Sequence, residues 1–64
     1  MFIKLTSYSD DVPLYINLNY VALIRPDYKV NSVTVVVMNN DVRHPVKETP
    51  EYILQHFARG GVSE

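Results

Sequence analysis

Cysteine is absent from this 64-residue sequence, and neither sign of charge is in clear excess. Without thiols the chain has no disulfide, no thiolate nucleophile and none of the cysteine ligands that most structural zinc sites use. Lys and Arg total 6 against 7 Asp and Glu, which gives a formal net charge of −1 and no general attraction to a phosphate backbone. We therefore expect no redox chemistry, no metal and no cofactor, and charge alone disfavours nucleic acid as the partner.

Long apolar runs are also absent. No stretch approaches the roughly 20 residues that a membrane helix needs. The first residues, Met1 to Thr6, lack the charged region, the apolar stretch and the small-residue cleavage site that are typical of a signal peptide. From these two absences we expect a cytoplasmic protein with no membrane span.

The apolar content is sufficient for one small domain. The hydrophobic share is 47% and the charged share 20%, which is ordinary globular usage, and a chain of this length has room for one core, so residues 1–64 are predicted to form a single domain. For so short a chain, roughly 25 cal/mol per Å² of buried apolar area barely offsets about 1.5 kcal/mol of ordering entropy per residue. We expect oligomerisation to add the missing buried surface.

Alternating apolar and polar residues predict a series of short strands. Residues 2–6 alternate, and in residues 12–18 the side chains of Leu14, Ile16 and Leu18 share one face while Tyr15 lies on the other. Residues 21–24 are a short apolar segment that is compatible with a strand or with one helical turn. Residues 32–38 contain four valines and are the clearest strand in the chain.

A hairpin follows the valine-rich strand. Asn39, Asn40 and Asp41 tolerate the left-handed backbone of a tight turn, and residues 42–47 alternate again on the return. Pro45 has no N–H to donate to a ladder, so we expect this strand at a sheet edge, on the side that faces water.

One helix is predicted at the carboxyl end. Thr49 is a favourable N-cap, Pro50 fits the first helical position and Glu51 suits the positive first turn. The spacing predicts a helix to about Ala58, with an apolar stripe, an outward polar face and a stop at Gly60-Gly61. The stripe comprises Ile53, Leu54, Phe57 and Ala58, and the outward face comprises Glu51, Gln55 and Arg59.

Together these elements predict a β-rich α+β domain in the order β-β-(β)-β-β-α. Its four or five antiparallel strands form a sheet or a small barrel. In the valine-rich strand Val33, Val35 and Val37 lie on one face, and the other face is also largely apolar. A single short helix cannot cover both faces, so either the sheet curls into a barrel or a second subunit covers the remaining face. We expect a homo-oligomer.

Three segments carry a resemblance to a known family. They are Ile3 to Thr6, Ile16 to Ile24, and Val46 to Ile53. In their order and spacing they resemble the FlbD family of flagellar and swarming motility proteins. The present turn at Asn39 to Asp41 departs from the glycine that the family tends to have. The resemblance implies a small, non-enzymatic accessory or regulatory role in motility, and it brings no catalytic residues with it.

Few side chains suggest chemistry. His44 and His56 could bind a metal only if the fold brought them together with a carboxylate such as Glu48, and nothing in their spacing indicates this. The adjacent Asp10 and Asp11 lie in a Ser-rich segment and are typical of a solvated turn. The sequence contains no nucleophile elbow, no glycine-rich phosphate loop and no metal motif, so we do not expect an enzyme.

Tyrosine and cationic residues offer two kinds of binding surface. Five tyrosines with five scattered Lys and Arg residues could stack and contact phosphates, as small β-barrels do on single-stranded RNA or DNA. A protein interface would use the same residue types and needs no net positive charge. We predict a protein partner, with nucleic acid as the alternative. The predicted partner-binding residues are Tyr15, Arg25, Arg43 and Lys47.

Overall fold

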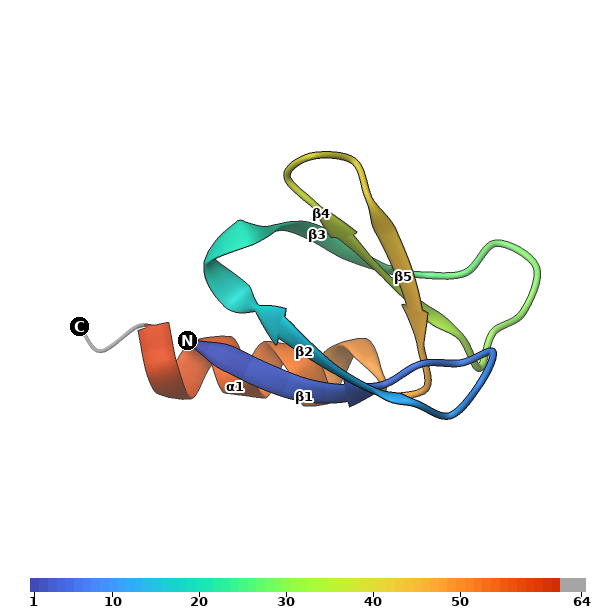
Figure 1. The fold of residues 1–64 in the computed structure, drawn as a ribbon, viewed down its shortest axis with the longest axis horizontal. Helices are drawn as coiled ribbons and strands as arrows, with labels where there is room; N and C mark the ends of the chain where they lie inside the picture. The colour runs from blue at the N-terminus through green and yellow to red at the C-terminus, as the bar shows by residue number, and fades with distance from the viewer. Residues whose placement is uncertain (62–64) are drawn as a thin grey trace.

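The computed structural model describes residues 1–61, with side chains to Phe57 (Figure 1). Its elements are β1 (Phe2–Thr6), β2 (Pro13–Asn17), a 3₁₀ turn η1 (Leu18–Tyr20), β3 (Val21–Pro26), β4 (Thr34–Met38), β5 (Arg43–Val46) and α1 (Pro50–Gly61). β1 and β2 form one antiparallel sheet, and β3, β4 and β5 form a second in that order. The predicted α+β class and strand order are therefore confirmed. The strands of the described chain lie in two sheets and do not close into a barrel, so the barrel alternative is wrong.

The β1–β2 hairpin has one buried and one exposed face, as the alternation predicts. Ile3 is opposite Ile16, and Leu5 is opposite Leu14. Ile3, Leu5 and Ile16 are buried, whereas Tyr15 is exposed on the other face.

The ambiguous segment 21–24 is a strand, and the helical turn precedes it. The Asn17 side chain accepts a hydrogen bond from the backbone N–H of Asn19 at 3.0 Å, which starts the 3₁₀ turn η1. β3 follows and contains a β-bulge: Val21 is opposite Met38 and Leu23 is opposite Val37, which leaves Ala22 as the extra residue.

β4 is the central strand of its sheet and joins β5 through the predicted tight turn. Asp41 has a φ of 70°, the left-handed conformation that Asn and Asp accept more readily than most residues. The Met38 N–H donates to Val42 O at 2.8 Å and closes the hairpin. The predicted edge position of β5 is also confirmed.

The outer side of β5 meets the end of β1, so the expectation that this edge faces water is wrong for its carboxyl half. Ser7 bridges Val46, and the Tyr8 N–H donates to Pro45 O at 2.9 Å. The Lys47 N–H donates to Thr6 O at 3.0 Å. Pro45 fits here because its missing N–H points away from β4, while its carbonyl accepts from the other sheet.

Helix α1 begins as predicted and ends later than predicted. The Thr49 hydroxyl accepts a hydrogen bond from the Tyr52 N–H at 3.1 Å, as an N-cap does. The helix includes Gly60 and Gly61 and so extends past the predicted Ala58; glycine accepts helical angles at a cost of about 1 kcal/mol. The side chains of Ala58 and Arg59 lie outside the described residues. Within residues 1–61, no helix is both long and apolar enough to cross a membrane.

One core lies between the two sheets and the helix. Figure 1 shows hairpin β1–β2 and helix α1 on the same side of the three-stranded sheet. Every element contributes to the core, and Ile53 of α1 is fully buried in it. The buried members are Ile3, Leu5, Ile16, Leu18, Val36, Val46 and Ile53.

β4 is buried on both faces within a single chain. Thr34 and Val36 face the core side, and Val33 and Val35 are buried although they belong to the opposite face and stand outside the core cluster. The expectation that only a barrel or a second subunit could cover both faces is therefore wrong for these four residues. A second subunit is not needed to bury them, so oligomerisation stays a prediction that needs other support.

Candidate interaction surface

The three-stranded sheet turns one face away from the core. In one row across the strands Leu23 is opposite Val37, and Val37 is opposite Arg43. In the next row Arg25 is opposite Val35, and Val35 is opposite Pro45. We call these six residues the outer sheet face: Leu23, Arg25, Val35, Val37, Arg43 and Pro45.

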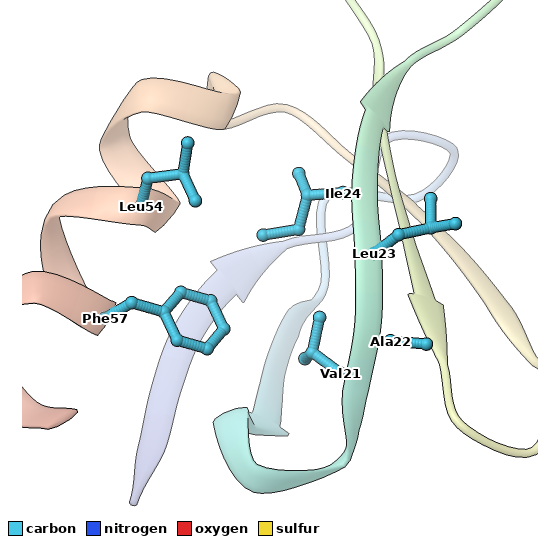
Figure 2. A pocket seen from close by; sticks show the side chains of 6 residues that line it. All are labelled: Val21, Ala22, Leu23, Ile24, Leu54 and Phe57. Atoms are coloured by element: carbon cyan, nitrogen blue, oxygen red, sulfur yellow. The ribbon is translucent and has the colours of Figure 1, made fainter.

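The bulge at Ala22 decides which side chains of β3 reach this face. Strand side chains alternate between faces, and an extra residue shifts that alternation by one. Figure 2 shows Val21 and Ile24 pointing toward α1, with Ala22 and Leu23 pointing the opposite way. Without the extra residue, strict alternation from Val21 would turn Arg25 toward the core and Ile24 out of it.

Arg25 is held in place by its neighbours. Its guanidinium carbon lies 4.3 Å from the centre of the Tyr28 ring, and its Nη1 donates to Pro26 O at 3.2 Å. Arg25 is half-buried, whereas Tyr28 is 86% exposed. Stacking on an aromatic face leaves the edge of the guanidinium, with its remaining N–H groups, free to bind an anion.

Arg43 occupies the opposite corner of the same face and is exposed. Its position is two strands and two residues from Arg25. With about 4.8 Å between strands and about 3.4 Å per residue, the two Cα atoms are about 12 Å apart. The outer sheet face therefore has a cation at each of two diagonal corners and apolar side chains between them.

Tyr15 and Lys47, the other two predicted binding residues, lie outside these two rows. Tyr15 is 64% exposed on the outer face of the β1–β2 hairpin, opposite Lys4. Lys47 forms an ion pair with Asp11, and the hydrogen bond between them raises the pKa of the Lys47 ammonium. The structure thus places Arg25 and Arg43 on one sheet face, whereas Tyr15 lies on the other sheet and Lys47 is paired with Asp11.

An apolar groove between β3 and α1 was not anticipated from the sequence. Val21 and Ile24 point across it toward Leu54 and Phe57, and its volume is about 260 Å³ (Figure 2). Leu54 is 54% exposed, although the helical spacing places it in the apolar stripe. The sequence does contain a sign of this groove. The apolar stripe of the helix is wider than is needed to bury Ile53 alone. We call this feature the β3–α1 groove.

Asp10 and His56 make local contacts within their own segments. Asp10 accepts a hydrogen bond from the Val12 N–H at 3.4 Å, as expected of a turn. His56 Nδ1 lies 3.0 Å from Tyr52 O, on its own helix. Among the described residues no three His, Cys, Asp or Glu side chains are grouped as a metal site would need.

Asp27 organises the loop beside Arg25. Its Oδ2 accepts hydrogen bonds from the backbone N–H groups of Lys29 and Val30, at 2.9 and 3.0 Å. These bonds lower the pKa of the Asp27 carboxyl, with smaller contributions from the charges of Arg25 and Lys29. The carboxylate therefore stabilises the loop that contains Tyr28.

Comparisons with protein-family models, with curated proteins and with solved structures found no match to this chain. The resemblance to the FlbD family thus stays a prediction that these comparisons do not test.

Proposed function

We propose that this protein is a small, non-enzymatic interaction module that acts by binding a protein partner through the outer sheet face. One observation carries the proposal. Two arginines lie at opposite corners of a sheet face that is outside the core cluster, on which Leu23 is 48% exposed and Val37 is half-buried. Arginine beside a compact apolar centre is a common composition of protein-binding hot spots.

The cellular setting is part of the same proposal. It includes a cytoplasmic location for the chain. The resemblance to the FlbD family supports a regulatory or accessory role in motility. Both proposals are independent of which partner binds the outer sheet face.

Partner capture by matched charge-reversal variants tests the binding surface. We expect Arg43→Glu to fold normally, since the side chain is exposed, and to lose proteins that the unaltered chain captures from a lysate. Lys4→Glu, on the outer face of the other sheet, is the control and is expected to keep them. Capture that is the same for both variants contradicts a role for this face.

Self-association is proposed at the β3–α1 groove. In β3, the Asp27 N–H donates to Val33 O at 2.8 Å; by antiparallel alternation the backbone N–H and C=O of Ile24 point away from β4. Two β3 strands paired about a two-fold axis at Ile24 would satisfy these groups in both copies and bring two apolar grooves together. Val21, Ile24, Leu54 and Phe57 carry no charge, so a second copy meets no repulsion there.

Solution mass tests self-association. Light scattering over a hundredfold dilution is expected to show a dimer that Leu54→Glu converts to a monomer, because the variant places a charge in the groove. Glu51→Gln, exposed on the same helix, is the matched control. A monomer at every concentration of the unaltered chain contradicts the proposal.

Single-stranded nucleic acid is the alternative partner, and one observation favours it. The Arg25–Tyr28 stack, 4.3 Å from guanidinium carbon to ring centre, combines a cation with an exposed aromatic ring. Titration of labelled RNA and DNA at two salt concentrations separates the functions. A salt-dependent dissociation constant below about 10⁻⁶ M favours nucleic acid over protein.

A further inference from the structure

The outer sheet face carries two arginines that form no ion pair among residues 1–57. The ion pair found among residues 1–57 joins Lys47 to Asp11, on the side of the molecule where the two sheets meet. The Asp27 carboxylate keeps its charge and interacts with Arg25 at a distance longer than an ion pair. Asp27 accepts two backbone N–H groups, and Glu48 accepts two hydrogen bonds from Thr6. A partner that complements this face therefore supplies its own anions.

The spacing of the two arginines limits how those anions are arranged. Arg25 and Arg43 lie at diagonal corners, with Cα atoms about 12 Å apart by strand geometry, and Val35 and Val37 lie between them. In an extended peptide, side chains four residues apart project from the same side and are separated by about 13 Å. The side chain midway between them lies over β4, where Val37 is half-buried and Val35 is buried.

Tyr28 lowers the entropic cost of binding at one corner. A free arginine loses rotamer freedom when it binds an anion, whereas Arg25 is already stacked on Tyr28. Of the five N–H donors of a guanidinium, one of those on Arg25 is engaged with Pro26 O. The remaining N–H groups can donate to both oxygens of a carboxylate.

We infer that the outer sheet face binds an extended, acidic protein segment with two carboxylates four residues apart and an apolar side chain between them. The inference rests on the proposed protein-binding function and adds the chemistry of the partner. A nucleic acid fits less well, because phosphate binding needs several cations and this face has two. The half-buried Val37 and the exposed Leu23 beside it also favour an aliphatic side chain over a stacked base.

Defined peptides and the full-length chain test the inference by NMR. The probe contains the sequence Glu-Ser-Val-Ser-Glu, which has glutamates four residues apart, and its control has glutamine in place of both. At low salt we expect the acidic peptide to shift the amide signals of Val35 and Val37, with a dissociation constant of about 10⁻⁴ M. The glutamine peptide is expected to bind at least about tenfold more weakly, because the charge-assisted hydrogen bonds are lost.

Variants assign the binding to the two arginines. Arg25→Glu and Arg43→Glu are each expected to lower the affinity for the acidic peptide by about tenfold or more. Lys4→Glu is expected to leave that affinity unchanged. A peptide with one glutamate replaced by lysine is expected to recover affinity for the Arg43→Glu variant. Recovery is a result that damage to the fold would not produce.

Tyr28 is tested as a positioning residue. Tyr28→Ala is expected to lower the affinity for the acidic peptide several-fold. Tyr28→Phe is expected to retain that affinity, because the guanidinium stacks on the ring and does not need the hydroxyl. Equal loss in both variants contradicts a positioning role.

Two results would overturn the inference. One is equal affinity for the acidic and glutamine peptides, and the other is tighter binding of an oligothymidine at Val35 and Val37. If partner capture depends on Arg43 while the acidic peptide does not bind, the inferred chemistry is wrong and the proposed function stands. If capture does not depend on Arg43 and the peptide does not bind, both are wrong.

Discussion

Glu48 accepts two hydrogen bonds from Thr6, a residue 42 positions earlier in the chain. The Thr6 N–H donates to Oε1 at 2.9 Å, and the Thr6 hydroxyl donates to Oε2 at 3.0 Å. The pair joins the end of β1 to the segment between β5 and α1. The two hydrogen bonds therefore connect two segments that are far apart in the sequence.

Glu48→Ala is expected to lower the free energy of unfolding by about 1–3 kcal/mol, because the half-buried Thr6 N–H loses its acceptor. Glu48→Gln retains one acceptor oxygen and is expected to cost less. Urea denaturation followed by circular dichroism measures both. Glu51→Ala, on the exposed side of the first helical turn, is the control at about 0.5 kcal/mol. A Glu48→Ala variant as stable as this control contradicts the proposed link.

Two valines give a matched test of the core. Val36 is fully buried, and Val42 is 44% exposed just after the hairpin turn. Val36→Ala is expected to cost about 2–3 kcal/mol from lost burial and the resulting cavity, and Val42→Ala less than about 0.5 kcal/mol. Thermal or urea unfolding measures the loss of stability in each variant. Similar costs for the two variants would mean that Val36 does not occupy the core.

Asp41 tests the left-handed turn. Its φ of 70° is costly for residues with an ordinary side chain and costs glycine nothing. We expect Asp41→Ala to destabilise the chain by about 1 kcal/mol and Asp41→Gly to leave it as stable or slightly more stable. The FlbD family tends to have a glycine in this turn, which suits the same backbone requirement. If alanine and glycine had equal effects, measured by urea unfolding, residue 41 would not need a left-handed backbone.

Asp27 predicts a pH dependence. Hydrogen bonds from the Lys29 and Val30 N–H groups lower its pKa below the usual 3.8, so its contribution to stability is present above that value. The contribution is lost as the pH falls through the lower pKa of the folded state. We expect Asp27→Asn to be less stable than the unaltered chain at pH 7 and to approach it in stability near pH 2. An Asp27 carboxyl pKa at or above 3.8, measured by NMR titration, would contradict this prediction.

Local sequence determined most of the secondary structure. The period-2 alternation around Ile16 defines a strand with one buried face, and the valine-rich segment defines the central strand. Thr49 and Pro50 determine where the helix begins, because an N-cap and a first-turn proline act over a few residues. The end of the helix was less predictable, since glycine permits a stop without requiring one.

The tertiary structure alone decided which residues share a surface. Arg25 and Arg43 were candidates from composition, but only the strand order β3-β4-β5 and the bulge at Ala22 place them on one face. The contact between Thr6 and Glu48 and the groove beside Leu54 also depend on segments far apart in the chain. Periodicity reports the environment of a residue along its own strand or helix, whereas strand order and register arise from packing between elements.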